Sequence, residues 1–133
     1  MATQKFPGKI SIEKASNTMS STHTTPNHTR HLEALHRHLK HPQRRGGIGP
    51  IPPIVCADGF TMSVQASRAH MCTPREDVGP WLSVEVGFPN RIEPLLWPYA
   101  EVPGNWTETV YGGVPVEIVA AVVELHGGFA TPV

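Results

Sequence analysis

Residue types that bind metals or act as nucleophiles stand close together in the segment VQASRAHMCTPRED, residues 64–77. His70 and Cys72 are two residues apart, and with Cys56 and His126 they could offer four ligands to a zinc ion. Their spacing is tighter than the C-x₂₋₄-C spacing of structural zinc sites, so the spacing does not itself specify such a site. Cys72 could also act as a nucleophile with His70 or His126 as its base, but no acid that would orient the histidine can be named.

The alternative interpretation gives the same residues structural roles. Both cysteines suit a buried core, where a thiol behaves as a small apolar group. His126 suits the C-terminal end of a helix, where the macrodipole favours a cation. We therefore predict no metal and no cofactor, and we interpret residues 68–80 first as a connection between strands and second as a contact loop.

Period-two alternation predicts a strand on each side of that connection. In FTMSVQAS, about residues 60–67, the inward side chains are Phe60, Met62, Val64 and Ala66; in WLSVEVGF, about residues 81–88, they are Leu82, Val84, Val86 and Phe88. Two such neighbouring strands most economically pair antiparallel. The opposite face would be polar and free to contact another molecule, and a tryptophan beside polar residues suits a protein interface. The predicted binding surface comprises Gln65, Arg68, Arg75, Trp81 and Glu85.

Two helices are predicted to pack against the apolar face of this hairpin. The first, about residues 91–101, begins after Asn90, and Pro98 is expected to kink it or end it early. The second, about residues 115–126, has Pro115 at its start and Gly127 just past its end, although its β-branched residues also suit a strand. With residues 109–111 as a third short strand or a turn, we predict a small α+β domain over residues 54–130.

A short amphipathic helix is predicted before this domain, over residues 29–41, with Leu32, Leu35 and Leu39 in one stripe. Such a helix is marginal alone. Because helix 115–126 is apolar over most of its surface, we expect either this stripe or a second subunit to cover it, so homo-oligomerisation is one prediction. The helix and a Pro/Gly linker occupy residues 29–53, and residues 1–28 are a polar leader that is predicted to be disordered.

The net charge of zero conceals an uneven distribution. Residues 1–45 carry eight Lys or Arg and two Glu, a net charge of +6, whereas residues 46–133 carry three Arg and nine Asp or Glu, a net charge of −6. A basic arm could contact the phosphates of nucleic acid, an acidic protein or the chain's own body, and a solvated tail is the simplest alternative. The basic residues of this arm are Arg30, Arg37, Lys40, Arg44 and Arg45.

Composition narrows the class of protein. No apolar run approaches the roughly 20 residues that span a bilayer, and the N-terminus lacks the apolar stretch of a secretory signal. Two cysteines do not make a disulfide framework. We therefore expect a soluble intracellular protein with reduced thiols and no membrane partner.

Several blocks of the sequence occur in an order that is similar to that of known proteins. DGFTMSVQAS, CTPR, GPWLSVEVGFP, EPLLWPYAE and TVYGGVPVEIVAAVVELHGG resemble a group of small uncharacterised proteins encoded by tailed bacteriophages and prophages. The resemblance covers about residues 54–129 and leaves out the basic arm. No activity and no site residues can be carried over from this group. The resemblance implies a phage accessory gene whose product acts on host machinery in the host cytoplasm.

These observations lead to one main hypothesis. Many small phage proteins bind and block a target, anti-CRISPR proteins among them. We expect a non-catalytic protein that binds a host protein or a protein–nucleic-acid complex, with inhibition of bacterial defence as one such role. Two alternatives stay open: a small metal-dependent or Cys/His enzyme built around residues 65–85, and an oligomer that sequesters a small ligand.

Overall fold

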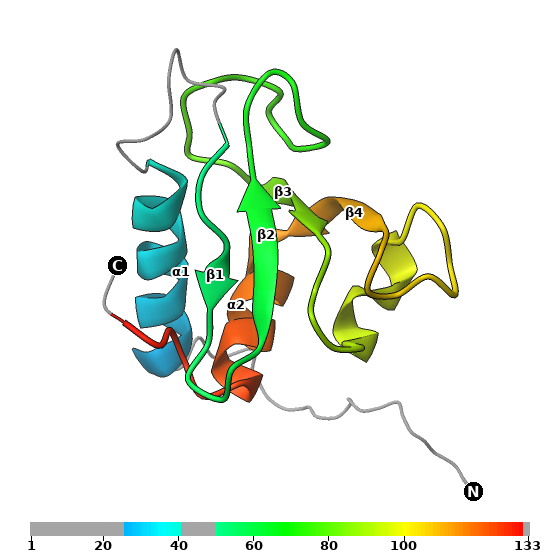
Figure 1. Ribbon diagram of the computed structural model, residues 1–133. Helices are drawn as coiled ribbons and strands as arrows, with labels where there is room; N and C mark the ends of the chain where they lie inside the picture. Colours follow the sequence, from blue (N-terminus) through cyan, green and yellow to red (C-terminus); the bar gives the residue numbers. More distant parts are fainter. Residues whose placement is uncertain (1–25, 41–49, 132–133) are drawn as a thin grey trace, which may run out of the picture.

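The chain has an α+β fold in which a four-stranded antiparallel sheet carries two α-helices on one face (Figure 1). The computed structural model describes residues 26–40 and 50–131. In chain order the elements are α1 (Pro26–Leu39), β1 (Ile54–Val55), β2 (Thr61–Gln65), β3 (Ser83–Gly87), the 3-10 helix η2 (Pro94–Tyr99), β4 (Val110–Pro115) and α2 (Val116–Leu125). The predictions for the leader before residue 26 and for residues 41–49 lie outside the described residues.

The strands follow one another across the sheet in the order β1-β2-β3-β4, each antiparallel to its neighbour. Val64 lies opposite Val86 and Gln65 lies opposite Glu85, so the antiparallel pairing of the two alternating segments is confirmed. Met62 and Val84 are also buried, which confirms the apolar face. β1 was not predicted, because two residues are too few to show an alternation.

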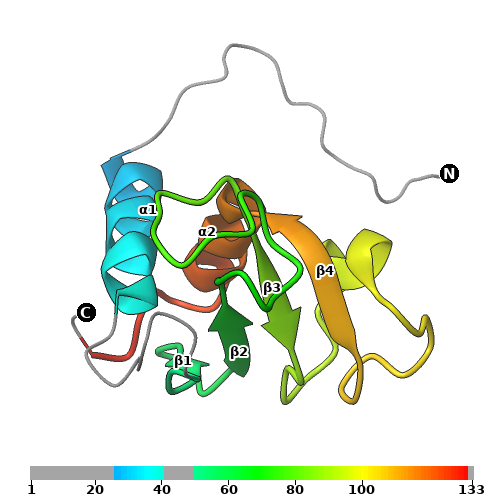
Figure 2. The same cartoon turned by 90° about the horizontal axis from the view of Figure 1, so that it is seen from above.

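α1 and α2 pack against each other on the same face of the sheet (Figure 2). Leu35 and Leu39 of α1 are completely buried, so the predicted leucine stripe does dock. On α2, the core-facing side chains include Val119 and Val122. Because the sheet and α1 cover α2 from two sides, the apolar surface of α2 no longer requires a second subunit. Within residues 26–40 and 50–131, no helix has both the length and the apolar character needed to cross a membrane.

The second predicted strand is shorter than its pattern suggested, and the prediction is wrong at both ends. Leu82 and Phe88, which were predicted to point inward, are 71% and 60% exposed. Trp81, which was predicted to point outward, is 2% exposed. Phe88 has a positive φ of 52°, and such a residue interrupts the extended conformation on which period-two alternation depends.

The helix predicted over residues 91–101 is replaced by the short 3-10 helix η2. Pro94 opens η2 and Pro98 lies inside it, and a proline within an α-helix removes a backbone hydrogen bond and clashes with the preceding turn. The side chain of Glu93 caps the start, because its Oε2 accepts from the backbone N–H of Leu95 at 3.0 Å. η2 lies beside β4, at the edge of the sheet farthest from α1 (Figure 1).

Asn90, the predicted helix cap, has a different role. Its Oδ1 accepts from the backbone N–H of Thr61 at 2.9 Å, and its Nδ2 donates to the carbonyl of Gly59 at 3.0 Å. Asn90 therefore ties the segment after β3 to the start of β2, where it satisfies the backbone N–H and carbonyl of Thr61 beyond the last β2–β3 pair, Ser63 and Gly87.

Candidate functional site

The five residues predicted to form a binding surface do not share one exposed face. Arg68 and Arg75 are exposed, Glu85 is half-buried, and Gln65 and Trp81 are buried. The prediction of an open polar face on the β2–β3 hairpin is therefore wrong for Gln65 and Trp81, which belong to the interior.

The segment before β1 covers Gln65, and the 68–80 loop covers Trp81. The amide of Gln65 donates to the carbonyl of Ile51 at 3.0 Å and accepts from its N–H at 3.2 Å, so the segment before β1 covers it. The indole N–H of Trp81 donates to the carbonyl of Glu76 at 3.1 Å. Its ring lies so close to Gly79 that a Cβ there would come within 2.6 Å of the ring.

The loop of residues 68–80 is held by its own polar groups. Arg68 forms an ion pair with Asp77. Oε1 of Glu85 accepts from the backbone N–H of Met71 at 2.9 Å, so Glu85 anchors this loop on the sheet. Arg75 stays exposed and lines an open pocket beside β4.

The four candidate metal ligands are divided between the two ends of β2. Cys56 precedes the strand, and His70 and Cys72 follow it. His126 stacks on Phe60, which is the residue before β2 begins. The four residues therefore do not converge on one zinc site. Residues 26–40 and 50–131 contain no group of three or more His, Cys, Asp or Glu side chains placed to hold a metal ion.

Both cysteines are buried free thiols. Burial is the main cause that raises the pKa of Cys56 to about 11, and the charge of Asp58 adds to it. A thiol with such a pKa is a poor nucleophile at neutral pH. Sγ of Cys72 lies 3.1 Å from the carbonyl oxygen of Ser67 and donates to it, and Nδ1 of His70 lies 2.7 Å from the hydroxyl of the same serine. These contacts favour structural roles over the nucleophilic one.

The described part of the basic arm lies on α1. Arg30, Arg37 and Lys40 are exposed, and α1 is on the opposite side of the molecule from η2 (Figures 1 and 2). Arg44 and Arg45 lie outside the described residues. A partner that contacts both α1 and η2 would therefore have to reach around the sheet.

A charged cluster that the sequence patterns did not reveal joins Asp58, His126 and Glu93, and we call it the carboxylate–histidine clamp. Nδ1 of His126 lies 2.7 Å from Oδ2 of Asp58, and Nε2 lies 2.7 Å from Oε1 of Glu93. Because an ionised carboxylate only accepts, an imidazolium that donates from both nitrogens satisfies both contacts. The ring also stacks on Phe60, with 4.1 Å between the ring centroids.

The electrostatics of the clamp favour this charged state. Burial alone would lower the pKa of His126, but the hydrogen bonds and charges of Asp58 and Glu93 outweigh it, so its pKa is raised. The pKa of Asp58 is lowered, first by the backbone N–H of Phe60 and then by His126. Since both ring nitrogens are engaged, the clamp joins the β1–β2 turn, the start of η2 and the end of α2, and it leaves no nitrogen to act as a base.

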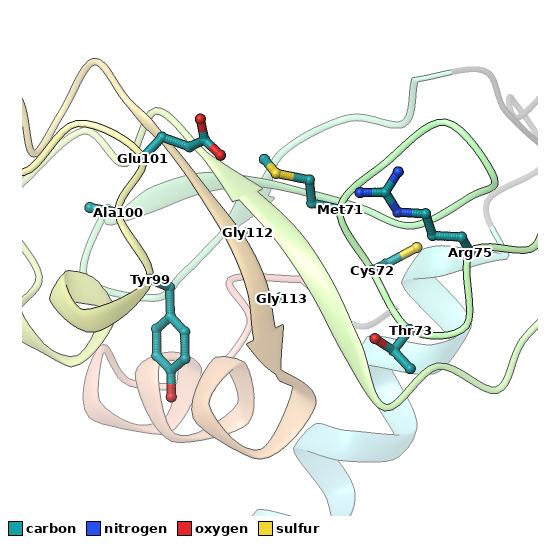
Figure 3. Close-up of a pocket in the computed structure, with 9 residues that line it drawn as sticks. All are labelled: Met71, Cys72, Thr73, Arg75, Tyr99, Ala100, Glu101, Gly112 and Gly113. Carbon is teal, nitrogen blue, oxygen red and sulfur yellow. The ribbon is translucent and has the colours of Figure 1, made fainter.

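An open pocket of about 420 Å³ lies against β4 (Figure 3). One wall comes from the 68–80 loop, the other comes from the end of η2 and the residues after it, and Gly112 and Gly113 of β4 lie between them. The lining residues are Met71, Cys72, Thr73, Arg75, Tyr99, Ala100, Glu101, Gly112 and Gly113. The pocket thus has a glycine floor with a positive and a negative side chain among its walls.

Exposed apolar side chains are concentrated on η2 and the segments at its two ends. Trp97 is 41% exposed and its ring stacks on that of Trp106, with 4.8 Å between the centroids. Together with the exposed residues Ile92, Leu95 and Val102, these two side chains make up what we call the tryptophan surface. Two exposed carboxylates, Glu101 and Glu108, belong to the same segment.

Comparisons with protein-family models, with curated proteins and with solved structures each give no match for this chain.

Sequence reasoning missed both the clamp and the tryptophan surface. The sequence held a weak signal for the tryptophan surface. Trp97 and Trp106 lie in the stretch EPLLWPYAEVPGNW, whose three prolines and one glycine disfavour a long buried helix. The glycine pair Gly112-Gly113 signalled the floor of the pocket in the same way, since adjacent glycines allow close approach to a backbone.

Proposed function

We propose that this chain is a non-catalytic binding protein of phage origin that captures a host protein or protein–nucleic-acid complex and thereby inhibits a bacterial defence system. The observation that carries the proposal is the tryptophan surface. Tryptophan is enriched among the few residues that dominate binding energy at protein interfaces, and exposed apolar patches of this kind commonly mark interaction sites. The resemblance of residues 54–129 to phage proteins supports the phage setting.

Hydrogen bonds and a buried side chain hold the tryptophan surface in one conformation. The hydroxyl of Tyr111 donates to the carbonyl of Trp106, and Oγ1 of Thr109 accepts from the N–H of Val102 at 3.0 Å. Leu96, next to Trp97, is completely buried and fixes η2 to the core. An interface that is already ordered loses less conformational entropy on binding.

The charges next to this surface favour a basic partner. Glu101 and Glu108 are exposed residues of the segment between η2 and β4 that also carries Trp106, and residues 46–133 carry a net charge of −6. Arginine side chains both pair with carboxylates and stack on indole rings. We therefore expect the contacted region of the host protein to carry arginine or lysine, and we expect association to slow as salt screens the charges.

The test is a plating assay in bacteria that carry a defined CRISPR–Cas system and are challenged with a phage that this system targets. The full chain should restore plaque formation, and Trp97→Ala should remove most of the effect. Val78→Ser is the matched control, because Val78 is exposed but belongs to the 68–80 loop. Once the target is known, Trp97→Ala should raise its Kd by roughly 30-fold, the equivalent of a hot-spot loss of about 2 kcal/mol.

Other variants distinguish the alternatives. Cys72→Ala and His70→Ala should leave the effect intact; loss of activity in either variant with the fold preserved would establish the enzyme alternative. Charge reversal at Arg44 or Arg45 should weaken capture if the basic arm contributes. If Trp97→Ala and Val78→Ser bind an identified target with equal affinity, the tryptophan surface is not the interface.

A further inference from the structure

The pocket beside β4 has walls that are fixed in place before any ligand binds. The backbone N–H of Gly113 donates to the carbonyl of Met71 at 3.0 Å, which attaches the 68–80 loop to β4. On the other side, the N–H of Glu101 donates to the carbonyl of Val110 at 2.9 Å. Both walls are therefore hydrogen-bonded to the same strand, which sets the width of the pocket between them.

At Gly113, the floor of the pocket leaves the backbone open to a ligand. At Gly113, a Cβ would meet nothing within 4 Å, so the space beside this residue is open. At Gly112, a Cβ would come within 2.9 Å of Sδ of Met71, so the methionine side chain lies against the glycine and forms an apolar side of the pocket. The volume of about 420 Å³ is within the range of small-ligand sites.

Two opposite charges face this space without neutralising each other. Figure 3 shows the carboxylate of Glu101 and the guanidinium of Arg75 turned toward the same region beside Met71, from the two walls. Both side chains are exposed. Among the described ion pairs, which involve Arg68, Arg91 and His126 as the cations, neither Arg75 nor Glu101 takes part.

We propose that this pocket binds a small zwitterion, a molecule with one carboxylate and one amine joined by a short aliphatic chain. The carboxylate would pair with Arg75, whose guanidinium fits a carboxylate in a bidentate geometry. The ammonium group would pair with Glu101, and the aliphatic part would lie on Met71 and Gly113. Glu101 belongs both to this pocket and to the segment of the tryptophan surface, but Arg75 and Met71 line the pocket alone, so the Arg75→Gln result tests this proposal separately from the proposed function.

The experiment is a titration of the ¹⁵N-labelled full chain with glycine, 4-aminobutyrate and 6-aminohexanoate, which carry the same two charges at increasing separation. Butyrate and butylamine are the controls that carry one charge each. We expect one of the three zwitterions to shift the amide signals of Gly112 and Gly113 with saturation, and to bind at least about tenfold more tightly than either control.

Variants test the two charges separately. Arg75→Gln and Glu101→Gln should each weaken the best zwitterion by about tenfold or more, whereas Arg37→Gln on α1 and Glu108→Gln outside the pocket should not. All four substitutions are on exposed side chains, and dispersion of the amide spectrum reports whether each variant is folded. Gly112→Ala is a second blocking variant, because its methyl group pushes Met71 out of its present position.

Three results would overturn the proposal. The first is no saturable shift at Gly112 and Gly113 with any zwitterion up to about 10 mM. The second is equal affinity for butyrate or butylamine, which would show that one charge suffices. The third is unchanged zwitterion affinity in both Arg75→Gln and Glu101→Gln, which would show that the ligand binds elsewhere.

Discussion

Replacing His126 with Gln is expected to destabilise the fold strongly, although His126 lies outside every regular element. The glutamine amide has one nitrogen and one oxygen that only accepts, so it can replace the donor of only one of the two ring nitrogens, and it carries no charge. Glu93 is 3% exposed, so in the variant it becomes a buried carboxylate without a cation. Such groups are costly, because the protein interior does not replace the hydration that they lose.

The size of the effect follows from the contacts on the Glu93 side of the clamp. A hydrogen bond to a charged group contributes about 1.5–3 kcal/mol, and loss of the stacked contact with Phe60 adds about 0.5–1.5 kcal/mol. We take about 3 kcal/mol as the loss in the free energy of unfolding. For a domain of this size, that loss corresponds to a fall in Tm of roughly 12–24 °C.

The assay is urea denaturation of the wild type, His126→Gln, Glu93→Gln and the double variant at about pH 6, where an unperturbed histidine is largely charged. A double-mutant cycle isolates the interaction of the pair from the other effects of each substitution. Glu117→Gln is the matched control, because Glu117 is an exposed acidic residue of α2. A coupling free energy below about 0.5 kcal/mol would refute the reasoning, since this is the level at which independent sites add.

The same variant should remove a pH dependence whose sign can be stated. His126 has a pKa above its ordinary value of 6.5, so its contribution is complete below pH 6.5 and is lost as the pH rises through the raised value. Asp58 has a pKa below 3.8, so its contribution is present above pH 3.8 and is lost as the pH falls through the lowered value. The clamp therefore stabilises the fold most between these two limits.

His31 opposes this trend. Burial is the main cause that lowers its pKa, so stability from its neutral form is lost as the pH falls below 6.5. The informative quantity is therefore the difference in unfolding free energy between the wild type and His126→Gln at each pH, in which the His31 contribution cancels. This difference should shrink as the pH rises above 6.5, and a difference that stays constant or grows would contradict the assigned charge state.

Three further predictions concern the core and the loops. Leu35→Ala should cost about 2–5 kcal/mol in urea denaturation, because Leu35 is completely buried, whereas Leu82→Ser, at a side chain that is 71% exposed, should change stability by less than about 0.5 kcal/mol. Gln65→Leu should cost about 1–3 kcal/mol, because it leaves the N–H and carbonyl of Ile51 without their partner; a neutral result would mean that water replaces the amide. Cys56 should react with iodoacetamide only as fast as the protein unfolds, measured by mass spectrometry against a urea-unfolded sample; rapid labelling of Cys56 in the folded protein would show that this thiol is accessible.

Local patterns predicted the middle of the two central strands and failed at the ends of β3. Val64 and Val86 occupy the predicted positions because both lie inside paired strands, where alternation is imposed by the pleat. Leu82 and Phe88 lie one residue outside β3, where no ladder imposes it. Helix α2 was predicted nearly at its observed limits, because Pro115 and Gly127 mark its two ends.

The site could not be predicted from local patterns, because its parts meet only after folding. His126 bonds to Asp58, which lies 68 positions earlier in the chain, and to Glu93, which lies 33 positions earlier. No spacing rule links such positions. Burial of Gln65 and Trp81 also depends on other segments, namely residues near Ile51 and residues of the 68–80 loop. The sequence showed which side of the hairpin is polar, but a polar face that is covered by another segment is not a binding surface.

The clamp and the tryptophan surface are connected through Glu93. Its Oε2 caps η2 through the N–H of Leu95, while its Oε1 bonds to His126, so one buried carboxylate fixes the start of η2 to the end of α2. Leu96 then enters the core, and Trp97 faces outward one residue later. An exposed indole on a short 3-10 helix would otherwise be mobile, because such a helix has few hydrogen bonds of its own. The buried charge is therefore best understood as the support that holds Trp97 in place against its stacked neighbour Trp106.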